Sequence, residues 1–217
     1  MRRSVKDFVS IVAARLPIQE PIYEFGSLQV PGQEGFADLR GLFPGRDYVG
    51  CDMRPGPGVD RILDLHHIDL PAESVGTVLC LDTLEHVEYP REALDGIYRI
   101  LKPGGMAVLS SVAYFPVHDH PNDYWRFTPE AFTSLLKPFP HSFVGHAGNQ
   151  FFPDPVVGIG FKKESPCLAG FEPEFLRWQR RHSRSLEHIV AMAAPPKLLP
   201  LIFGLHARLM SRLRRTP

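Results

Sequence analysis

The segment from residue 75 to residue 112 is the strongest constraint on the fold. An apolar run, VGTVLCLD, is followed by a helical pattern, YPREALDGIYRILKPGG, and then by a second apolar run, MAVLSSV. The helical pattern ends at Pro-Gly-Gly, and its apolar residues share one side: Ala93, Leu94, Ile97, Ile100 and Leu101. Two buried strands joined by an amphipathic helix predict a parallel strand–helix–strand unit.

The same alternation extends along most of the chain. Helical spacing covers residues 4–16, 35–43 and 129–136, the last with Thr128 as the expected N-cap. Short apolar strands are predicted at 21–26, 47–52 and 59–65, and two more, at 141–148 and 155–163, have no helix between them and should pair antiparallel. We therefore expect an α/β doubly wound, mostly parallel sheet with a terminal antiparallel hairpin.

Acidic residues follow three of the predicted strands. Glu24 lies near the end of the first, Asp52 ends the second, and Asp82 ends the strand in VGTVLCLD. A single acid can end a strand only because it starts a turn. The carboxyl ends of parallel strands meet at one edge of a sheet, where ligands bind. Three acids converging on that edge favour a binding site.

Charge divides the chain into two parts. The formal net charge is zero, but residues 177–217 hold nine Lys/Arg and one acid. We expect one domain over residues 1–163 and a helical extension with a basic end over residues 164–217. In the tail from Lys197 onward no aromatic residues interleave with the arginines, so we do not expect nucleic-acid binding. The extension either packs on the body or a second subunit, or lies on an anionic membrane surface.

Neither the cysteines nor the hydropathy pattern indicates export or a membrane span. Cys51, Cys80 and Cys167 lack metal-ligand spacing, and two lie in apolar strands, which predicts buried free thiols in a reducing cytoplasm. No apolar stretch reaches the roughly 18 residues that a membrane span requires. We expect a cytoplasmic protein, with peripheral membrane contact through the extension left open.

Four stretches together resemble a known family. They are YEFGS, YVGCDM, LDTLEHVEYPREALDGIYRILKPGGMAVLSS and the terminal hairpin. They resemble the class I S-adenosylmethionine-dependent methyltransferases, particularly the small type 11 group, over about residues 20–163. The most specific stretch is Cys80–Ser111. The resemblance implies a Rossmann-like seven-stranded sheet and S-adenosylmethionine as cofactor.

The resemblance also implies which residues bind the cofactor. Asp52 matches the acid that accepts hydrogen bonds from both ribose hydroxyls, which suits the two oxygens of a carboxylate. Met53 would pack on the adenine, and Asp64 would face its amino group. Gly26, without a Cβ, would let the backbone pass close to the amino acid moiety. The full implied set is Glu24, Gly26, Ser27, Asp52, Met53, Asp64, Leu65, Leu81, Asp82 and Thr83.

The glycine-rich turn departs from the family pattern. Leu28 and Val30 stand where further glycines are usual, and Glu24 lies more residues before Asp52 than the family would have it. We expect the chain to turn later, near Pro31-Gly32, with Gly32 and Gly35 taking over the turn. The departure also supports an alternative, a catalytically inactive methyltransferase fold that serves as a binding or partner subunit.

The loop VHDHPNDYWRF follows the last strand of the parallel series and should lie above the transferred methyl group. Its first part offers a general base for an oxygen acceptor in His118, Asp119 or His120, with His86 as a further candidate. Its second part would recognise the acceptor through Asp123, Tyr124, Trp125 and Arg126.

Each of these residues also has a structural alternative. His86 can cap its helix, Trp125 and Phe127 can anchor the loop, and Arg126 can pair with Asp123. A His-x-His pair on an irregular loop is weak evidence for a metal, and we expect none.

The sequence therefore predicts a methyltransferase acting on a small-molecule or glycan-type acceptor, with oxygen as the expected acceptor atom. A nicotinamide-dependent oxidoreductase is disfavoured because no G-x-G-x-x-G follows the first strand.

Overall fold

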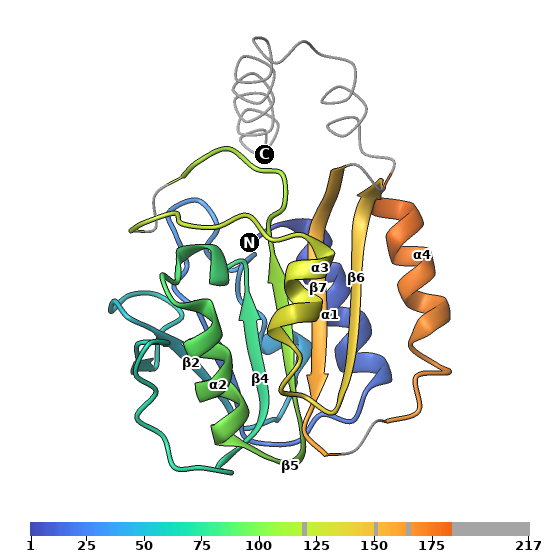
Figure 1. Ribbon diagram of the computed structural model, residues 1–217. Coiled ribbons are helices and arrows are strands. Elements are labelled where there is room, and N and C mark those ends of the chain that lie inside the picture. The colour runs from blue at the N-terminus through green and yellow to red at the C-terminus, as the bar shows by residue number, and fades with distance from the viewer. Residues whose placement is uncertain (119–120, 150–151, 164–165, 184–217) are drawn as a thin grey trace.

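A seven-stranded sheet forms the centre of the molecule (Figure 1). The computed structural model describes residues 1–118, 121–149, 152–163 and 166–183, and the strand order in this part of the chain is β3-β2-β1-β4-β5-β7-β6. β7 runs antiparallel to β5 and β6, while the other neighbouring pairs are parallel. The predicted Rossmann-like sheet with its terminal antiparallel hairpin is confirmed. The strands are β1 Ile22–Phe25, β2 Tyr48–Asp52, β3 Arg61–Ile62, β4 Val75–Leu81, β5 Leu101–Ser111, β6 His141–Asn149 and β7 Phe152–Phe161.

Helices cover both faces of the sheet (Figure 1). α2 and α3 pack on one face, and α1 and α4 on the other, each with its own apolar cluster. Strand residues alternate between the clusters: Val78 and Cys80 of β4 join the first, and Leu79 and Leu81 the second. The helical elements are α1 Arg3–Arg15, α2 Pro90–Ile100, α3 Pro129–Leu135 and α4 Glu172–His182, with 3₁₀ turns η1 Arg40–Leu42 and η2 Leu84–His86.

Two helix ends follow the sequence signals differently. α3 begins as predicted, because the Thr128 hydroxyl accepts a hydrogen bond from the Ala131 amide at 3.2 Å. α2, however, ends at Ile100 and β5 begins at Leu101 without a loop, so Pro-Gly-Gly lies in the strand instead of closing the helix.

The helix predicted at residues 35–43 is wrong. Only the 3₁₀ turn η1 forms there, although Leu39 and Phe43 are buried against α1 as their spacing suggested. The Lys6 ammonium donates to the carbonyls of Phe36 and Asp38 at 2.6 and 3.1 Å. These carbonyls would accept the first bonds of a helix, so a tertiary contact replaces the local one.

The edge at the carboxyl ends of β1, β2 and β4 also receives the start of the chain. α1 runs across the back of the sheet and begins at this edge, where Figure 1 marks the N-terminus close to the tip of β4. Met1 and Arg2 consequently lie among the strand ends.

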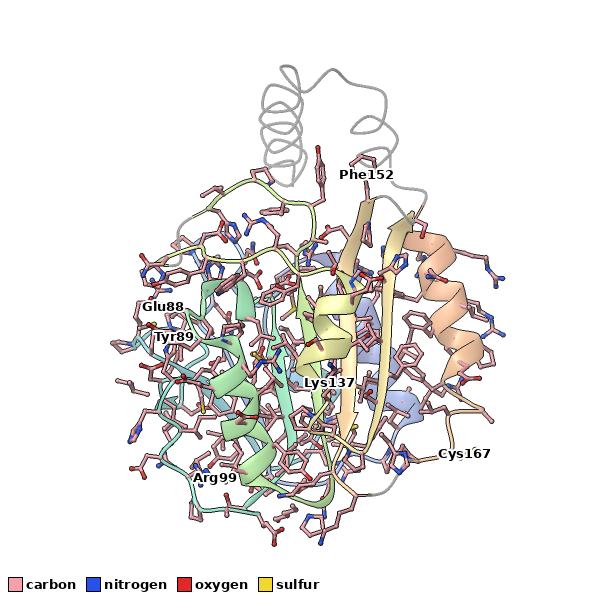
Figure 2. All side chains as sticks on the ribbon, in the orientation of Figure 1. Glu88, Tyr89, Arg99, Lys137, Phe152 and Cys167 are labelled. Atoms are coloured by element: carbon pink, nitrogen blue, oxygen red, sulfur yellow. The ribbon has the colours of Figure 1, made fainter. Side chains whose placement is uncertain are left out.

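At the opposite end of the strands, α2 contacts the segment that precedes β4. Arg99 of α2, at the bottom of Figure 2, donates to the carbonyls of Ile68 and Leu70 at 2.7 and 2.8 Å, which holds the segment before β4 against the helix. Cys51 and Cys80 are free and buried, as predicted, whereas the free thiol of Cys167 is exposed (Figure 2).

The segment after β7 is described only as far as residue 183. There α4 packs on α1 through Trp178, whose indole N–H donates to the Ser4 carbonyl at 2.7 Å. No helix among the described residues is both long and apolar enough to cross a membrane. The alternatives for the basic tail concern residues outside the described part.

Candidate active site

A cavity of about 370 Å³ opens at the carboxyl ends of the parallel strands. It brings together the three strand-end acids, Glu24, Asp52 and Asp82, as their positions in the sequence indicated. All ten residues implied for cofactor binding line it, and so do His86 and His118. Its size lies in the range of small-molecule sites.

The turn after β1 depends on glycine at position 26. Gly26 has a φ of +82°, and a Cβ there would stand 2.1 Å from the Thr83 hydroxyl oxygen. The Thr83 hydroxyl lies 2.9 Å from the Leu81 carbonyl of β4 and 3.3 Å from the Phe25 carbonyl of β1, so it is held between the two strands. Any side chain at position 26 would therefore both strain the backbone and push β1 away from β4.

The chain makes its second turn later, as predicted. The Gln33 amide donates to the Val30 carbonyl at 3.0 Å, and Gly32 between them has a φ of +84°. These are the features of a type II turn with glycine at its third position. The amides of Gly26 and Ser27 both donate to the Cys51 carbonyl, at 2.8 and 3.0 Å. The polar atom that the first turn offers to the cavity is instead the buried Ser27 hydroxyl, which has no partner among the described residues.

Asp52 and Met53 occupy the end of β2. One oxygen of the Asp52 carboxylate accepts the Arg54 amide at 3.0 Å, which fixes the side chain at the cavity wall. Met53 is 51% exposed at the rim, unusually open for a large apolar side chain and available to a flat apolar ligand. These positions fit a carboxylate for a ribose diol beside an apolar contact for a base.

Asp64 is anchored by its neighbour. One of its oxygens accepts the His66 amide at 2.9 Å and lies 2.8 Å from His66 Nδ1. Burial by itself would raise the pKa of Asp64, but the hydrogen bonds and charge of His66 outweigh it and lower the pKa. His66 also lines the cavity, a position that the sequence did not single out.

Glu24 is the most buried of the three strand-end acids. Its side chain is 4% exposed, and the Tyr48 hydroxyl donates to it at 2.6 Å. Burial raises the pKa of Glu24 to about 7, so near neutral pH the carboxyl is partly protonated.

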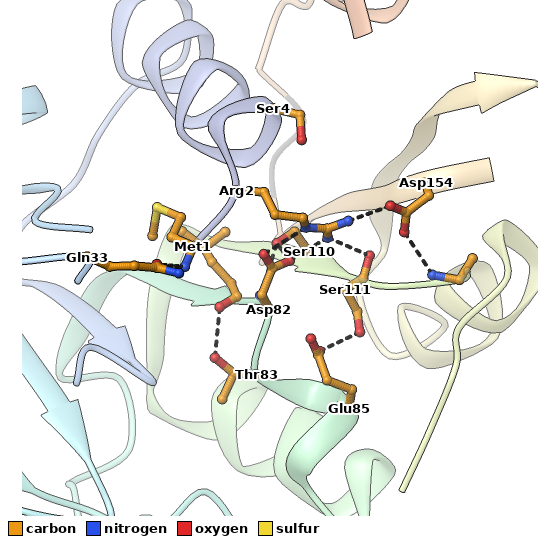
Figure 3. Close-up of polar contacts among 12 residues, drawn as sticks. Met1, Arg2, Ser4, Gln33, Asp82, Thr83, Glu85, Ser110, Ser111 and Asp154 are labelled. Atoms are coloured by element: carbon orange, nitrogen blue, oxygen red, sulfur yellow. Dashed lines mark hydrogen bonds and ion pairs between the residues drawn. The ribbon is translucent and has the colours of Figure 1, made fainter. Parts of the chain in front are cut away.

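Arg2 reaches Asp82 and Asp154 from the start of α1 (Figure 3). Its guanidinium donates to both oxygens of Asp82, at 2.7 and 3.1 Å, and to Asp154 at 2.6 Å. Asp82 also accepts the Ser110 hydroxyl at 2.8 Å, and its φ is +47°.

The two acids respond differently to this shared cation. For Asp82, burial alone would raise the pKa, but the charge of Arg2 outweighs it and the pKa is lowered. For Asp154, burial prevails and the pKa is raised in spite of Arg2. The partners lie 80 and 152 residues from Arg2, and no local pattern points to either, so the sequence could not reveal this contact.

Glu85 also lines the cavity, on η2 just after β4. Only 1% of the residue is exposed; one oxygen accepts the Ser111 hydroxyl at 2.6 Å (Figure 3), and the other is buried with no partner among the described residues. Burial and the nearby charge of Asp82 raise the pKa of Glu85 to about 8. The sequence analysis passed over this residue, although it stands next to His86 just after a strand.

The loop between β5 and α3 is docked onto η2 by backbone contacts. The amides of Tyr124 and Trp125 donate to the Glu85 carbonyl at 2.8 and 3.2 Å, and the Trp125 indole N–H donates to the Val87 carbonyl at 3.0 Å. Trp125 is nevertheless 44% exposed, whereas Phe127 is a core residue. Docking brings His118 to the cavity beside His86.

Arg126 and Asp123 stabilise the same loop from inside. Their guanidinium and carboxylate form two bonds of 2.5 and 2.6 Å, and Arg126 also donates to the carbonyls of Phe115 and Pro116. The hydrogen bonds from Arg126, together with the bond from the His118 amide, hold the pKa of Asp123 well below its usual range. Neither residue lines the cavity, and neither do Tyr124 and Trp125, so acceptor recognition by these four stays a prediction. Asp119 and His120 lie outside the described residues.

The central part of the chain matches a known protein family. Residues 46–109 match the family model described as a methyltransferase domain. The search of the curated proteins returned no match.

Among solved structures, the chain is similar to one from Haloferax volcanii, described as the complex between the Trm112 methyltransferase activator and the putative methyltransferase. The sequence identity is 18%, the match covers 76% of this chain and 92% of that chain, and the TM-score is 0.50. It is also similar to a Thermotoga maritima protein described as a SAM-dependent methyltransferase, at 19% identity, 74% and 89% coverage and a TM-score of 0.51. A third is the YcgJ protein of Bacillus subtilis, at 12% identity, 74% and 99% coverage and a TM-score of 0.52. At these identities the structures establish the fold alone.

The strand order is that of the class I methyltransferase fold, and residues 46–109 match a methyltransferase domain. The cavity fits S-adenosylmethionine, because it offers carboxylates, an apolar rim and a Ser27 hydroxyl without a partner among the described residues to a cationic nucleoside without phosphates.

Proposed function

We propose that this chain is an S-adenosylmethionine-dependent methyltransferase and that it methylates a hydroxyl oxygen of a small-molecule or glycan-type acceptor. The observation that carries the proposal is the group Glu85, His86 and His118, which lines the same cavity as the strand-end acids. A hydroxyl is a weak nucleophile and gains from losing its proton during transfer, whereas an amine in its neutral form does not need this help. Proton-accepting groups at that place favour oxygen.

The strand-end wall would hold the cofactor, which when bound supplies the methyl group as a sulfonium electrophile. We assign Asp52 to the ribose hydroxyls, Met53 to the adenine face and Asp64 to its amino group. Ser27 offers its hydroxyl to the amino acid moiety. Because Asp82 is fixed by Arg2, its contribution is the shape and charge of the wall rather than a free carboxylate.

The acceptor would enter from the side of the docked loop. His118, Glu85 and His86 orient its hydroxyl toward the cofactor and receive or relay its proton. Phe115, 42% exposed and also at the cavity, offers an apolar surface to the acceptor body. Positioning of this kind supplies much of the acceleration of a displacement at carbon.

The experiment that tests the proposal is methyl transfer from isotopically labelled cofactor to matched acceptors. Each acceptor scaffold is offered as a hydroxyl and as the corresponding amine, and the bond that carries the label is assigned by NMR. Label on oxygen, together with lost transfer in His118→Ala, supports the proposal. Label on nitrogen or carbon only, or full turnover in His118→Ala and His86→Ala, would refute it.

A cofactor-binding measurement decides the alternative of an inactive partner subunit. If calorimetry detects no S-adenosylmethionine binding at millimolar concentration, that alternative replaces an enzyme. The Haloferax methyltransferase is in complex with an activator, so the measurement should be repeated on any stable complex recovered with this chain.

A further inference from the structure

Three side chains on the acceptor side of the cavity lie close enough to share one cation. Glu85 and His86 come from η2, and His118 from the loop after β5. One carboxylate oxygen of Glu85 and one ring nitrogen of each histidine all lie within 4.8 Å of one another. The two imidazole rings meet edge to face, with centroids 4.8 Å apart. Small side-chain rotations would bring such atoms to the separations found around a single metal ion.

The histidines have the outer hydrogen bonds typical of metal ligands. His86 Nδ1 lies 2.5 Å from the Asn122 carbonyl oxygen. His118 Nδ1 lies 3.2 Å from the Pro116 carbonyl and 3.1 Å from an Asp123 carboxylate oxygen. These oxygens only accept, so the proton belongs on Nδ1 and Nε2 carries the lone pair. A carbonyl or carboxylate behind the imidazole is the usual way in which proteins orient a ligating histidine.

Glu85 supplies an independent observation. One of its oxygens is bonded to Ser111, but the other is buried and has no partner among the described residues. A buried oxygen without a partner costs roughly 1–3 kcal/mol. A cation between Glu85 and the histidines would remove this cost.

The two segments that carry the group are held together by backbone atoms. The Glu85 carbonyl accepts the amides of Tyr124 and Trp125, only a few residues beyond His118. Asp123 in turn is fixed by Arg126 through two bonds. The spacing of the three side chains is therefore set by the docked loop, as a preorganised site requires.

We propose that Glu85, His86 and His118 bind a divalent transition-metal cation that presents open coordination positions to the acceptor cavity. Two imidazoles and one carboxylate suit Zn²⁺, Mn²⁺, Fe²⁺ or Co²⁺. The inference rests on the proposed function and changes the part that the three side chains play in it. As metal ligands they would not receive the proton; the bound cation would instead take the acceptor hydroxyl as a ligand and promote loss of its proton to solvent. It revises the sequence expectation of no metal, and of the His-x-His pair considered there it uses only His118.

The test is direct binding of Co²⁺ and Zn²⁺ to the full chain after treatment with EDTA. Calorimetry gives the stoichiometry and affinity, and the visible spectrum of the Co²⁺ form reports imidazole ligands. We expect one site per chain and at least a tenfold loss of affinity in His118→Ala and in Glu85→Gln. His141→Ala is the matched control, because His141 is exposed at the start of β6, and it should bind like wild type.

Cofactor binding and circular dichroism show whether each variant is folded. If Glu85→Gln does not fold, the more exposed His118→Ala decides the matter. Equal cation affinity in wild type, His118→Ala and His141→Ala, or no binding to wild type, overturns the site. Cation binding without any methyl transfer to hydroxyls would instead contradict the proposed function and support the metal site.

Discussion

The two walls of the cavity are built in different ways. On the cofactor wall the acids stand at or just beyond strand ends, and two of them are held by neighbours in sequence, Asp52 by Arg54 and Asp64 by His66. On the acceptor wall the groups are held by contacts between distant segments, as Glu85 is by Ser111. The first wall is a property of the sheet, and the second exists only when a loop docks. Substitutions should therefore separate cofactor binding from acceptor use.

Arg2 holds Asp82 on the cofactor wall from a distant position in the sequence, and its substitution should give the largest loss of stability. Arg2→Ala leaves the buried carboxylates of Asp82 and Asp154 facing each other without their cation, which we expect to cost about 4 kcal/mol of unfolding free energy. Urea denaturation measures the loss. Arg3→Ala is the control, because its pair with Asp7 is exposed and contributes at most about 0.5 kcal/mol. Equal losses in the two variants would contradict a dominant role for Arg2.

Glu24 should make the cofactor wall sensitive to pH. Its pKa is raised from 4.5 to about 7, so the folded state holds more protons than the unfolded state between these values. Its contribution to stability is thus complete below pH 4.5, falls as pH rises to 7 and is then constant, a change of about 3 kcal/mol.

In Glu24→Gln this pH dependence should disappear. Unfolding free energies measured at closely spaced pH values in both proteins give the difference directly. A difference between the proteins that stays constant from pH 4.5 to 7 would mean that Glu24 titrates normally.

Asp52→Asn tests the cofactor wall alone. If Asp52 accepts both ribose hydroxyls, loss of its charge should weaken S-adenosylmethionine binding by about 3 kcal/mol, or about a hundredfold. Calorimetry measures the affinity, and Asp95→Asn, on the exposed side of α2, is the control. Unchanged affinity in Asp52→Asn would remove Asp52 from the cofactor site.

Trp125→Phe should have the smallest effect and the opposite pattern. It removes the indole bond to the Val87 carbonyl and loosens the docked loop by about 1 kcal/mol. We expect a fall of about tenfold or less in kcat/KM for the acceptor, with cofactor affinity unchanged. Steady-state kinetics and calorimetry on the same sample compare the two. A loss of cofactor affinity equal to that in Asp52→Asn would erase the distinction between the walls.

The sequence was informative where structure depends on short-range pattern. The alternation of apolar runs predicted the sheet, and the acids at strand ends predicted which residues would meet at its edge. The turn at Gly32 followed from the absence of glycine at positions 28 and 30. In each case neighbouring residues determine the outcome.

It was not informative where distant residues decide. The apolar spacing of residues 35–43 reported burial correctly, but Lys6 binds the carbonyls that a helix needed. Arg2 could not be assigned, because its partners lie on β7 and at the end of β4. For Glu85 the residue type was visible, but only the docked loop and Ser111 show that it is buried and held at the cavity.

The bond between Arg2 and Asp154 also has a consequence for the order of assembly. Among the described residues β7 is the last strand of the sheet in chain order, so it leaves the ribosome after the other six strands and long after Arg2, which precedes them all. Until β7 is inserted beside β5, one of the two carboxylates that neutralise Arg2 is missing. The N-terminal end of α1 then lacks part of its contacts at the strand ends. The contacts of Arg2 are therefore complete only after β7 has been made. A nascent chain that stops before β7 should leave the cavity incomplete, even though every residue assigned to the cofactor has already been made.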